Sequence, residues 1–239
     1  MGTAATFDLS GKRVLVTGGT RGIGREIAVA MTEHGATVTI TGTGVRGEEV
    51  DGFAYRRLDL VDAPSIEAAA ATFDGLDVLI NNAGVLFRDD QEYEPVVFEH
   101  VVSANLFGPY RVCRAFYPHL RESRGSIINV VSMRALMNAA GTPAYGVAKA
   151  GLLNLTRSLA VKWGGDGIRV NAIAPGPIRT DMNAAFRESA AATQAVTDGI
   201  PLGRWGDSHE IAGAAVYLAS PAAAFTTGGC IQIDGGILA

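Results

Sequence analysis

The sequence predicts an α/β protein: a single doubly wound domain built on a parallel sheet of about seven strands. Short runs rich in Val, Ile and Leu alternate with segments that are long enough for a crossover helix. A glycine-rich turn directly follows the first of these runs. The chain has 239 residues and contains no repeat and no Pro- or Ser-rich linker, so we expect residues 1–239 to form one domain.

Each expected strand is a short apolar run bounded by turn residues. In chain order the strands are Arg13–Thr17, Ala36–Thr41, Phe53–Leu58, Leu76–Ile80, Ser126–Val131, Ile168–Ala174 and Cys230–Asp234. The first helix should begin near Gly22 and end near Gly35, which can adopt the left-handed cap conformation. Strands that alternate with helices indicate a parallel sheet covered on both faces.

The composition excludes several classes of protein. The chain is 48% hydrophobic and 18% charged, which is typical of a folded domain with a sizeable core. Its net charge is −4 and it has no basic run, so we expect no nucleic-acid partner. Cys113 and Cys230 form no CxxC pair, and the four histidines are scattered. We therefore expect no metal site and a reducing compartment.

No stretch of the sequence predicts a membrane partner. No window is long and apolar enough to span a bilayer, and the N-terminus lacks the apolar core of a signal peptide. Gly2 and Thr6 match the loose N-myristoylation pattern, but no polybasic segment follows to supply a second anchor. We expect a cytoplasmic protein.

The segment VLVTGGTRGIGREIA places glycines between the first strand and the first helix. A strand, a tight glycine turn and a helix N-terminus together present backbone N–H groups and the positive end of a helix dipole. A pyrophosphate can approach this turn because glycine has no Cβ. The glycine spacing differs from the usual G-x-G-x-x-G order. In this context it still predicts a Rossmann-type dinucleotide site.

The end of the second strand favours NADP(H) over NAD(H). An NAD site carries an acidic side chain there that binds the ribose 2′-hydroxyl. Residues 37–45 contain no Asp or Glu, so nothing repels a 2′-phosphate. Arg21 and Arg46 are its candidate partners, with the alternative that both are solvated surface charges. The hydroxyl groups of Thr41 and Thr43 are further candidate donors, and NAD(H) remains the alternative cofactor.

Tyr145 and Lys149 lie four residues apart in a segment of small residues, PAYGVAKAG. Four residues are about one helical turn, so both side chains would share one helix face. Taken alone, the pair is typical of an amphipathic helix with two surface residues. The other motifs of the chain favour a catalytic pair.

Motifs along nearly the whole chain resemble the short-chain dehydrogenase/reductase family in its common single-domain form. They are TGGTRGIG (Thr17–Gly24), NNAG (Asn81–Gly84), AYGVAK (Ala144–Lys149), NAIAPGPIRTDM (Asn171–Met182) and IDGG (Ile233–Gly236). Each motif is modest on its own, but they occur in order and at matching spacings. The resemblance implies a single dinucleotide-binding and catalytic domain.

The resemblance also implies the catalytic roles. Tyr145 would be the general acid/base, and Ser132, thirteen residues before it, would orient the carbonyl or hydroxyl group. Lys149 would hold the nicotinamide ribose and lower the pKa of the tyrosine, which is about 10 when unperturbed. Asn105, forty residues before the tyrosine, would hold a water in the proton relay. Ser132 and Asn105 could otherwise be a strand-end serine and a buried hydrogen-bonding residue.

The cofactor would lie along residues from most of these motifs. The implied set is Gly18, Arg21, Gly22, Ile23, Gly24, Thr41, Asp59, Leu60, Asn82, Ala83, Gly84, Tyr145, Lys149, Pro175, Gly176, Ile178 and Thr180.

The implied function is an oxidoreductase that transfers a hydride between a nicotinamide cofactor and a small carbonyl or secondary alcohol substrate. The alternatives are an epimerase or dehydratase on the same fold, which usually has a longer C-terminal domain, and a non-catalytic dinucleotide sensor, which would be expected to lack the Tyr–Lys pair. Residues 182–200 resemble the variable substrate lid. Arg134 and Met137 are pocket candidates or plain surface and packing residues. A homo-oligomer, with a tetramer favoured, is expected from residues 95–120 and the apolar C-terminal segment.

Overall fold

Eight strands form the central sheet of this computed structural model, which describes residues 6–138 and 140–239. Gly2 of the myristoylation pattern lies outside the described residues. In the order β10-β7-β6-β5-β1-β2-β4-β3, the strands are Cys230–Ile233, Arg169–Pro175, Ser126–Val130, Val78–Asn81, Arg13–Val16, Thr37–Gly42, Phe53–Arg57 and Glu49–Val50.

The first seven strands of this order pair in parallel, which confirms the predicted parallel sheet. The eighth, β3, is a two-residue strand that pairs antiparallel with β4 at the sheet edge. It was not predicted because two residues carry no alternation of apolar and polar side chains. A small second sheet pairs β8 (Ile178–Arg179) with β9 (Gly206–Asp207).

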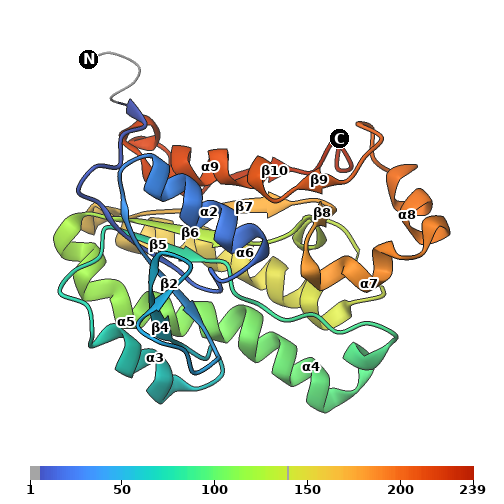
Figure 1. The fold of residues 1–239 in the computed structure, drawn as a ribbon, viewed down its shortest axis with the longest axis horizontal. Helices are drawn as coiled ribbons and strands as arrows, with labels where there is room; N and C mark the ends of the chain where they lie inside the picture. Colours follow the sequence, from blue (N-terminus) through green and yellow to red (C-terminus); the bar gives the residue numbers. More distant parts are fainter. Residues whose placement is uncertain (1–5, 139) are drawn as a thin grey trace.

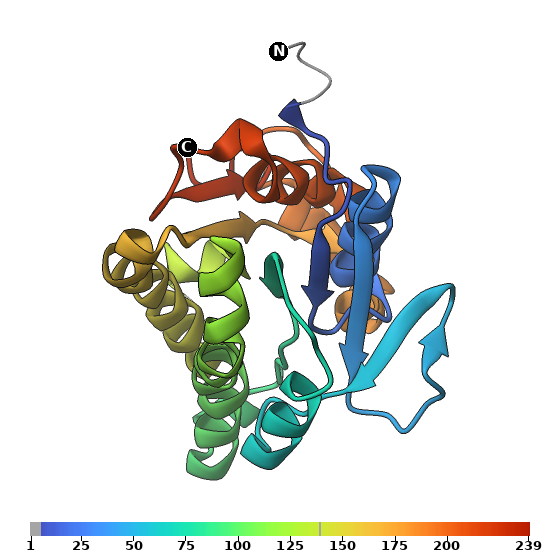
Figure 2. The same cartoon turned by 90° about the vertical axis from the view of Figure 1, so that its left-hand side faces the viewer.

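Helices cover both faces of the sheet, as Figures 1 and 2 show. On one face α2 (Gly22–Glu33) packs against α9 (His209–Ala219). The other face carries α3 (Ala63–Ala70), α5 (Gly108–Ser123) and α6 (Pro143–Trp163). As predicted, the first helix begins at Gly22 and is followed by Gly35 in a left-handed conformation, with φ at +94°.

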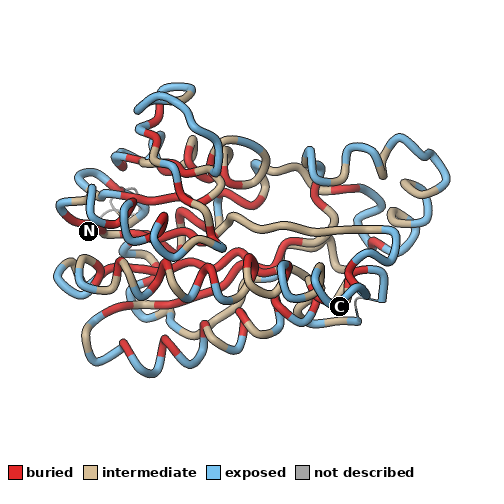
Figure 3. The backbone as a smooth tube through the Cα atoms, turned by 90° about the horizontal axis from the view of Figure 1, so that it is seen from below, coloured by how far each residue is buried: buried red, intermediate tan, exposed pale blue. Residues whose placement is uncertain are grey.

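The side chains of β1 show how the sheet is buried on both sides. Val14 and Val16 contact the α2 and α9 face, whereas Leu15 contacts the α3, α5 and α6 face. All three are at most 1% exposed. Alternate side chains of a strand point to opposite faces, so a strand buried on both faces is apolar at every position. Figure 3 shows buried residues along the interior strands and exposed ones along the outer loops.

A long helical segment contains one π-helical turn. Helix α4 (Pro95–Val102) continues through a π-helical turn (Ser103–Phe107) into α5. Asn105 lies in this wide turn and is fully buried. Such π-helical turns often occur at functional sites because the extra residue redirects a side chain.

The segment resembling a lid forms two short helices, α7 (Ala184–Arg187) and α8 (Ala190–Thr197). They lie away from the sheet, at the right of Figure 1. Among the described residues, no helix combines the length and apolar character needed to cross a bilayer.

Candidate active site

The parallel register brings the carboxyl ends of the strands to one edge of the sheet. The loops that follow β1, β5, β6 and β7 carry Gly18, Asn82, Ser132 and Gly176. In doubly wound folds, ligands bind outside the carboxyl ends of the strands. The predicted site residues therefore gather from segments that are far apart in the sequence.

The glycine turn is packed too tightly for side chains. Gly18 has φ at +65°, and a Cβ on it would lie 2.9 Å from the Cα of Ala83. A Cβ on Gly24 would collide with the Asn82 amide and the Gly18 carbonyl. Asn82 Nδ2 donates to the carbonyl oxygens of Thr17 and Gly18, at 3.0 and 3.1 Å, and so ties the turn to β5. Glycine is required here by close backbone approach.

The N-terminus of α2 is open to an anion. Its N-cap residue Arg21 is extended and makes no side-chain cap, and the first helical turn contains no acidic residue. Gly22 has φ at +55°, and a Cβ on it would lie 3.6 Å from the methyl group of Thr180, where the lid segment begins. First-turn N–H groups and the helix dipole together suit a pyrophosphate. The turn therefore fits the diphosphate of a dinucleotide.

Arg46 and Arg57 lie at the end of β2, and Arg21 lies in the glycine turn before α2. Arg21 and Arg46 are exposed, and within the described residues no carboxylate lies within 4.0 Å of either. Arg57 Nε donates to the carbonyl oxygen of Thr43 at 3.2 Å. Thr41 is only 1% exposed, so Thr43 is the exposed threonine of this strand end.

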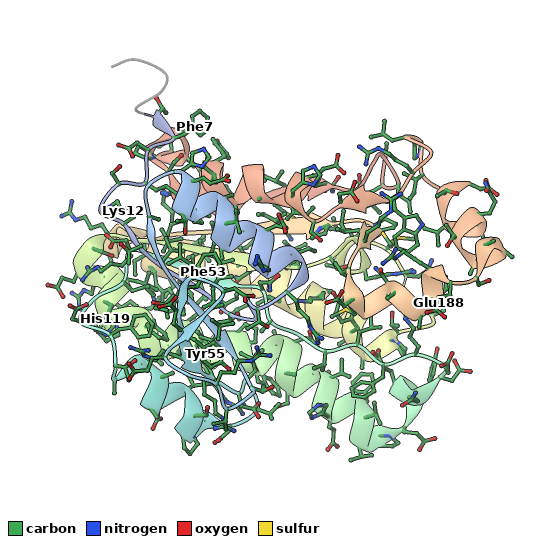
Figure 4. All side chains as sticks on the ribbon, viewed as in Figure 1. Phe7, Lys12, Phe53, Tyr55, His119 and Glu188 are labelled. Carbon is green, nitrogen blue, oxygen red and sulfur yellow. The ribbon has the colours of Figure 1, made fainter. Side chains whose placement is uncertain are left out.

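Arg57 was not among the predicted site residues. The register of β2 with β4 places it beside Gly42, and a sequence read strand by strand does not reveal that pairing. The neighbouring Tyr55, labelled in Figure 4, donates its hydroxyl hydrogen to the Gly44 carbonyl at 2.6 Å. Burial raises the pKa of Tyr55, and the charge of Arg46 partly offsets this effect.

Tyr145 and Lys149 lie one turn apart near the start of α6, as predicted. The Lys149 Nζ atom is 5.5 Å from the centroid of the Tyr145 ring and donates to the Val130 carbonyl at 2.8 Å. Lys149 is 3% exposed. Ser132 follows β6, and its Oγ accepts the Arg134 N–H at 3.2 Å.

Asn105 provides a buried hydrogen-bond acceptor near Lys149. Its Nδ2 donates to the carbonyl oxygens of Val85 and Val101, at 2.8 and 2.9 Å. Its Oδ1 is buried and has no hydrogen-bond partner among the described residues. A Cβ on Gly84 would collide with this Oδ1 and lie 3.7 Å from Lys149 Nζ. A buried acceptor of this kind suits a hydrogen-bonded water.

Burial changes the pKa of both residues of the pair. It raises the pKa of Tyr145 to about 12; the Ser132 hydroxyl lowers that pKa by hydrogen bonding, and the charge of Glu92 raises it further. Burial lowers the pKa of Lys149 to about 8. The expected fall in the tyrosine pKa is therefore not found in this structure. Loss of solvation disfavours the phenolate more strongly than its neighbours stabilise it.

The remaining predicted residues line the same edge of the sheet or support it. Asp59 Oδ1 accepts the Val61 N–H at 3.1 Å and so stabilises the turn after β4. Ile178 is buried, and Gly176 packs against Asp234. The other members of the cofactor set are partly buried or buried at the ends of the elements named above; they are Ile23, Leu60, Ala83 and Pro175.

The two pocket candidates after Ser132 are both partly buried. Arg134 Nη1 donates to the Asn138 carbonyl at 2.9 Å, which holds the guanidinium group against its own loop. Met137 lies on the same loop. Within the described part of the chain, no group of three or more His, Cys, Asp or Glu side chains is placed to hold a metal ion.

Sequence and structure comparisons place this geometry among known oxidoreductases. A family model described as enoyl-(acyl carrier protein) reductase matches residues 18–238. The chain is 38% identical to the 3-oxoacyl-(acyl-carrier-protein) reductase FabG of Vibrio harveyi, with 97% of this chain and 99% of the relative covered. It is 36% identical to the 2-dehydro-3-deoxy-D-gluconate 5-dehydrogenase of Bacillus subtilis, with 97% and 96% covered.

A solved structure is also closely similar. The crystal structure of gluconate 5-dehydrogenase from Burkholderia cenocepacia in complex with NADP and tartrate superposes with a TM-score of 0.92 at 31% identity, and 99% of each chain is covered. The fold and these relatives define an NAD(P)-dependent oxidoreductase. The chain belongs to the short-chain dehydrogenase/reductase family.

Lys149 makes the stability of the protein depend on pH. Between about pH 8 and 10.5, Lys149 is largely neutral in the folded protein but protonated in the unfolded chain. Because the unfolded state then binds more protons, this group makes the free energy of unfolding rise with pH. We expect the free energy of unfolding of wild type, relative to that of Lys149→Met, to rise by at least about 1 kcal/mol between pH 8 and pH 10. Taking the difference removes the opposite contribution of groups whose pKa is raised by burial, such as Cys113. Urea unfolding of both proteins across this range measures it; parallel curves would contradict it.

Proposed function

We propose that this protein is an NADP(H)-dependent reductase of carbonyl compounds, or dehydrogenase of the corresponding secondary alcohols, formed as one catalytic domain in the cytoplasm. One observation carries the proposal: Tyr145 and Lys149 meet beside Asn105 at the edge of the sheet where the glycine turn opens. Bound NADPH would supply the hydride.

In the proposed mechanism the Tyr145 hydroxyl donates a proton to the alkoxide that forms from the carbonyl. The Ser132 hydroxyl orients the carbonyl oxygen. Lys149 binds the nicotinamide ribose, and the free Oδ1 of Asn105 accepts a hydrogen bond from a water that returns the proton to the tyrosine. A neutral tyrosine is the acid that reduction requires, and Tyr145, with its pKa raised by burial to about 12, is protonated up to high pH.

The cofactor preference rests on charge at the end of β2. Charge-assisted hydrogen bonds to a 2′-phosphate can come from Arg46 and Arg57 at this strand end and from Arg21 in the glycine turn. Thr43 can add a neutral hydrogen bond. NADP is the nucleotide in the similar gluconate 5-dehydrogenase structure. NAD(H) remains the alternative cofactor because no feature of the site excludes it.

The substrate class follows from the relatives only in outline. One relative is named for a 3-oxoacyl group on a carrier protein, and another for an oxidised sugar acid. A panel of ketones, β-ketoesters and keto-sugars, followed by NADPH oxidation, therefore tests the proposed reaction. An epimerase or dehydratase would convert its substrate without net consumption of NADPH, and a sensor would bind the nucleotide without turnover.

We further propose a homo-oligomer, with a tetramer favoured. Large apolar side chains are exposed along α5, its preceding turn and α6: Phe107, Tyr110, Val147 and Val161. These exposed apolar residues support a contact between chains at these helices.

Replacement of Tyr145 by Phe removes the proton donor and little else. We expect kcat for carbonyl reduction to fall by about 10²- to 10⁴-fold while the dissociation constant for NADPH changes by less than about threefold. Steady-state kinetics and fluorescence titration with NADPH measure the two quantities. A variant that keeps more than about a tenth of wild-type kcat would contradict the assignment.

For the cofactor, we expect kcat/KM to favour NADPH over NADH by roughly 10- to 150-fold, which corresponds to one charge-assisted hydrogen bond. Arg21→Ala should reduce that ratio, with Arg46→Ala and Arg57→Ala measured beside it. Lys162→Ala, which removes a cation from the far end of α6, is the matched control and should leave the ratio unchanged. Equal or better use of NADH by wild type would overturn the preference.

The oligomer is tested by sedimentation equilibrium at micromolar concentration. We expect the mass of four chains, and Phe107→Asp combined with Val147→Asp should shift the distribution towards smaller species, because charges are unfavourable in an apolar interface core. A stable wild-type monomer would refute the proposal.

A further inference from the structure

Glu92 is a buried acid that the proposed reaction does not use. It lies in the 3₁₀ turn Gln91–Tyr93 and is 1% exposed. Its carboxylate accepts two main-chain N–H groups: Oε1 accepts that of Phe87 at 3.0 Å, and Oε2 accepts that of Tyr145 at 2.9 Å. Acids are rarely buried so fully without a specific partner.

The hydrogen bond to Tyr145 gives α6 an N-terminal cap that its own N-cap residue does not provide. Helix α6 begins at Pro143, and its N-cap residue Thr142 makes no side-chain hydrogen bond. Tyr145 is the third residue of the helix, so its N–H has no partner within the helix. The Glu92 carboxylate satisfies this N–H, and its negative charge lies at the positive end of the helix dipole. Glu92 therefore caps α6 from another segment of the chain.

The other N–H group that Glu92 accepts belongs to Phe87, in a loop that contacts the lid helix α7. Phe87 lies in the loop after β5, and its ring meets that of His100 edge-on, with centroids 6.1 Å apart. The next residue, Arg88, places its guanidinium carbon 5.1 Å from the ring centroid of Phe186 on α7. One carboxylate thus joins the backbone of Tyr145 to the loop that contacts the lid.

The loop is built to hold Glu92 in this place. Asp89 and Asp90, directly before the 3₁₀ turn, both have left-handed backbones, with φ at 57° and 62°. Aspartate tolerates this region better than most residues, but two in succession indicate a conformation fixed by its surroundings. The Tyr93 hydroxyl donates to the Ala140 carbonyl at 2.9 Å and anchors the turn just ahead of α6.

We propose that Glu92 is a positioning residue. It holds the main chain of Tyr145 against the loop that carries Phe87 and Arg88, and so keeps the Tyr145 hydroxyl at a fixed position relative to that loop and the lid helix it contacts. The inference rests on the catalytic role proposed for Tyr145. Displacement of a reacting group by about 1 Å costs up to about 10²-fold in rate. Loss of the hydrogen bond that holds the Tyr145 main chain should therefore lower the rate.

The charge of Glu92 has a second effect. It raises the pKa of the Tyr145 hydroxyl, whereas the hydroxyl group of Ser132 lowers it. Other charged groups lie on or beside the elements that pack against α6, and none of them shifts this pKa as Glu92 does; these are Arg134, Glu94, Glu99, His100 and, on α6 itself, Lys149. Removal of the Glu92 charge should therefore favour the phenolate.

Two substitutions separate the effect of the Glu92 charge from the effect of its side-chain length. Glu92→Gln removes the charge and can accept only one of the two N–H groups, since its amide nitrogen is a donor. Glu92→Asp keeps the charge but is one methylene too short to reach both. Glu94→Gln makes the same charge change at an exposed position two residues away and is the matched control. Near-ultraviolet circular dichroism checks that each variant is folded.

For carbonyl reduction we expect kcat to fall by about 10-fold or more in Glu92→Gln and in Glu92→Asp, with KM for NADPH nearly unchanged. In the alcohol-oxidation direction, the limb of the pH profile on which the rate rises with pH reports deprotonation of Tyr145. It should move to lower pH in Glu92→Gln by about one unit, as removal of a nearby charge implies. Glu92→Asp should leave that limb close to its wild-type position. Wild-type kinetics in Glu92→Gln would overturn the proposal.

Two measurements do not require turnover and so separate this proposal from the proposed function. Amide hydrogen exchange at Tyr145 should be faster in both Glu92 variants than in wild type and Glu94→Gln, because the N–H loses its acceptor. Titration of tyrosine labelled with ¹³C at Cζ should give a lower Tyr145 pKa in Glu92→Gln. Unchanged exchange and an unchanged pKa would refute the role of Glu92 even if wild type proved inactive towards every ketone tested.

Discussion

A chain of buried side-chain hydrogen bonds joins the sheet to α6, the helix that carries Tyr145 and Lys149. Asn129 on β6 accepts from Asn81 Nδ2 on β5 at 2.8 Å and donates to Thr156 Oγ1 on α6 at 2.9 Å. Breaking such a bond would leave a buried polar group unsatisfied, at a cost of about 1–3 kcal/mol. Thr156 lies two turns beyond Lys149, on the same helix face. The position of the Tyr–Lys pair above β5 and β6 depends on this link.

The same burial that fixes the helix also sets the chemistry. Tyr145 and Lys149 are removed from water, so burial raises the pKa of the phenol and lowers the pKa of the ammonium group. A proton donor that is neutral at physiological pH suits reduction, whereas oxidation needs the phenolate. In the proposed reaction, neutral pH would therefore suit reduction and alkaline pH the reverse reaction. The opposing influences of Ser132 and Glu92 adjust this balance.

Patterns within short stretches of sequence predicted the strands and the glycine turn, because both depend on neighbouring residues. The seven parallel strands were visible as apolar runs, and the glycine turn was visible because close backbone approach restricts residue type. Glu92 and Arg57 were not, since their contacts join residues 53 and 14 positions apart in the chain. The direction of the Tyr145 pKa shift was also missed: it depends on desolvation, which follows from tertiary packing rather than from the spacing of Tyr145 and Lys149.

Hydride transfer from NADPH to a carbonyl carbon is the reaction proposed for this site. The most direct measurement is the fate of deuterium from NADPH that carries deuterium at both C4 positions of the nicotinamide, followed by mass spectrometry of the product. We expect one deuterium on the carbinol carbon for each NADP⁺ formed. A product without deuterium, or conversion without net formation of NADP⁺ as in an epimerase or dehydratase, would contradict it.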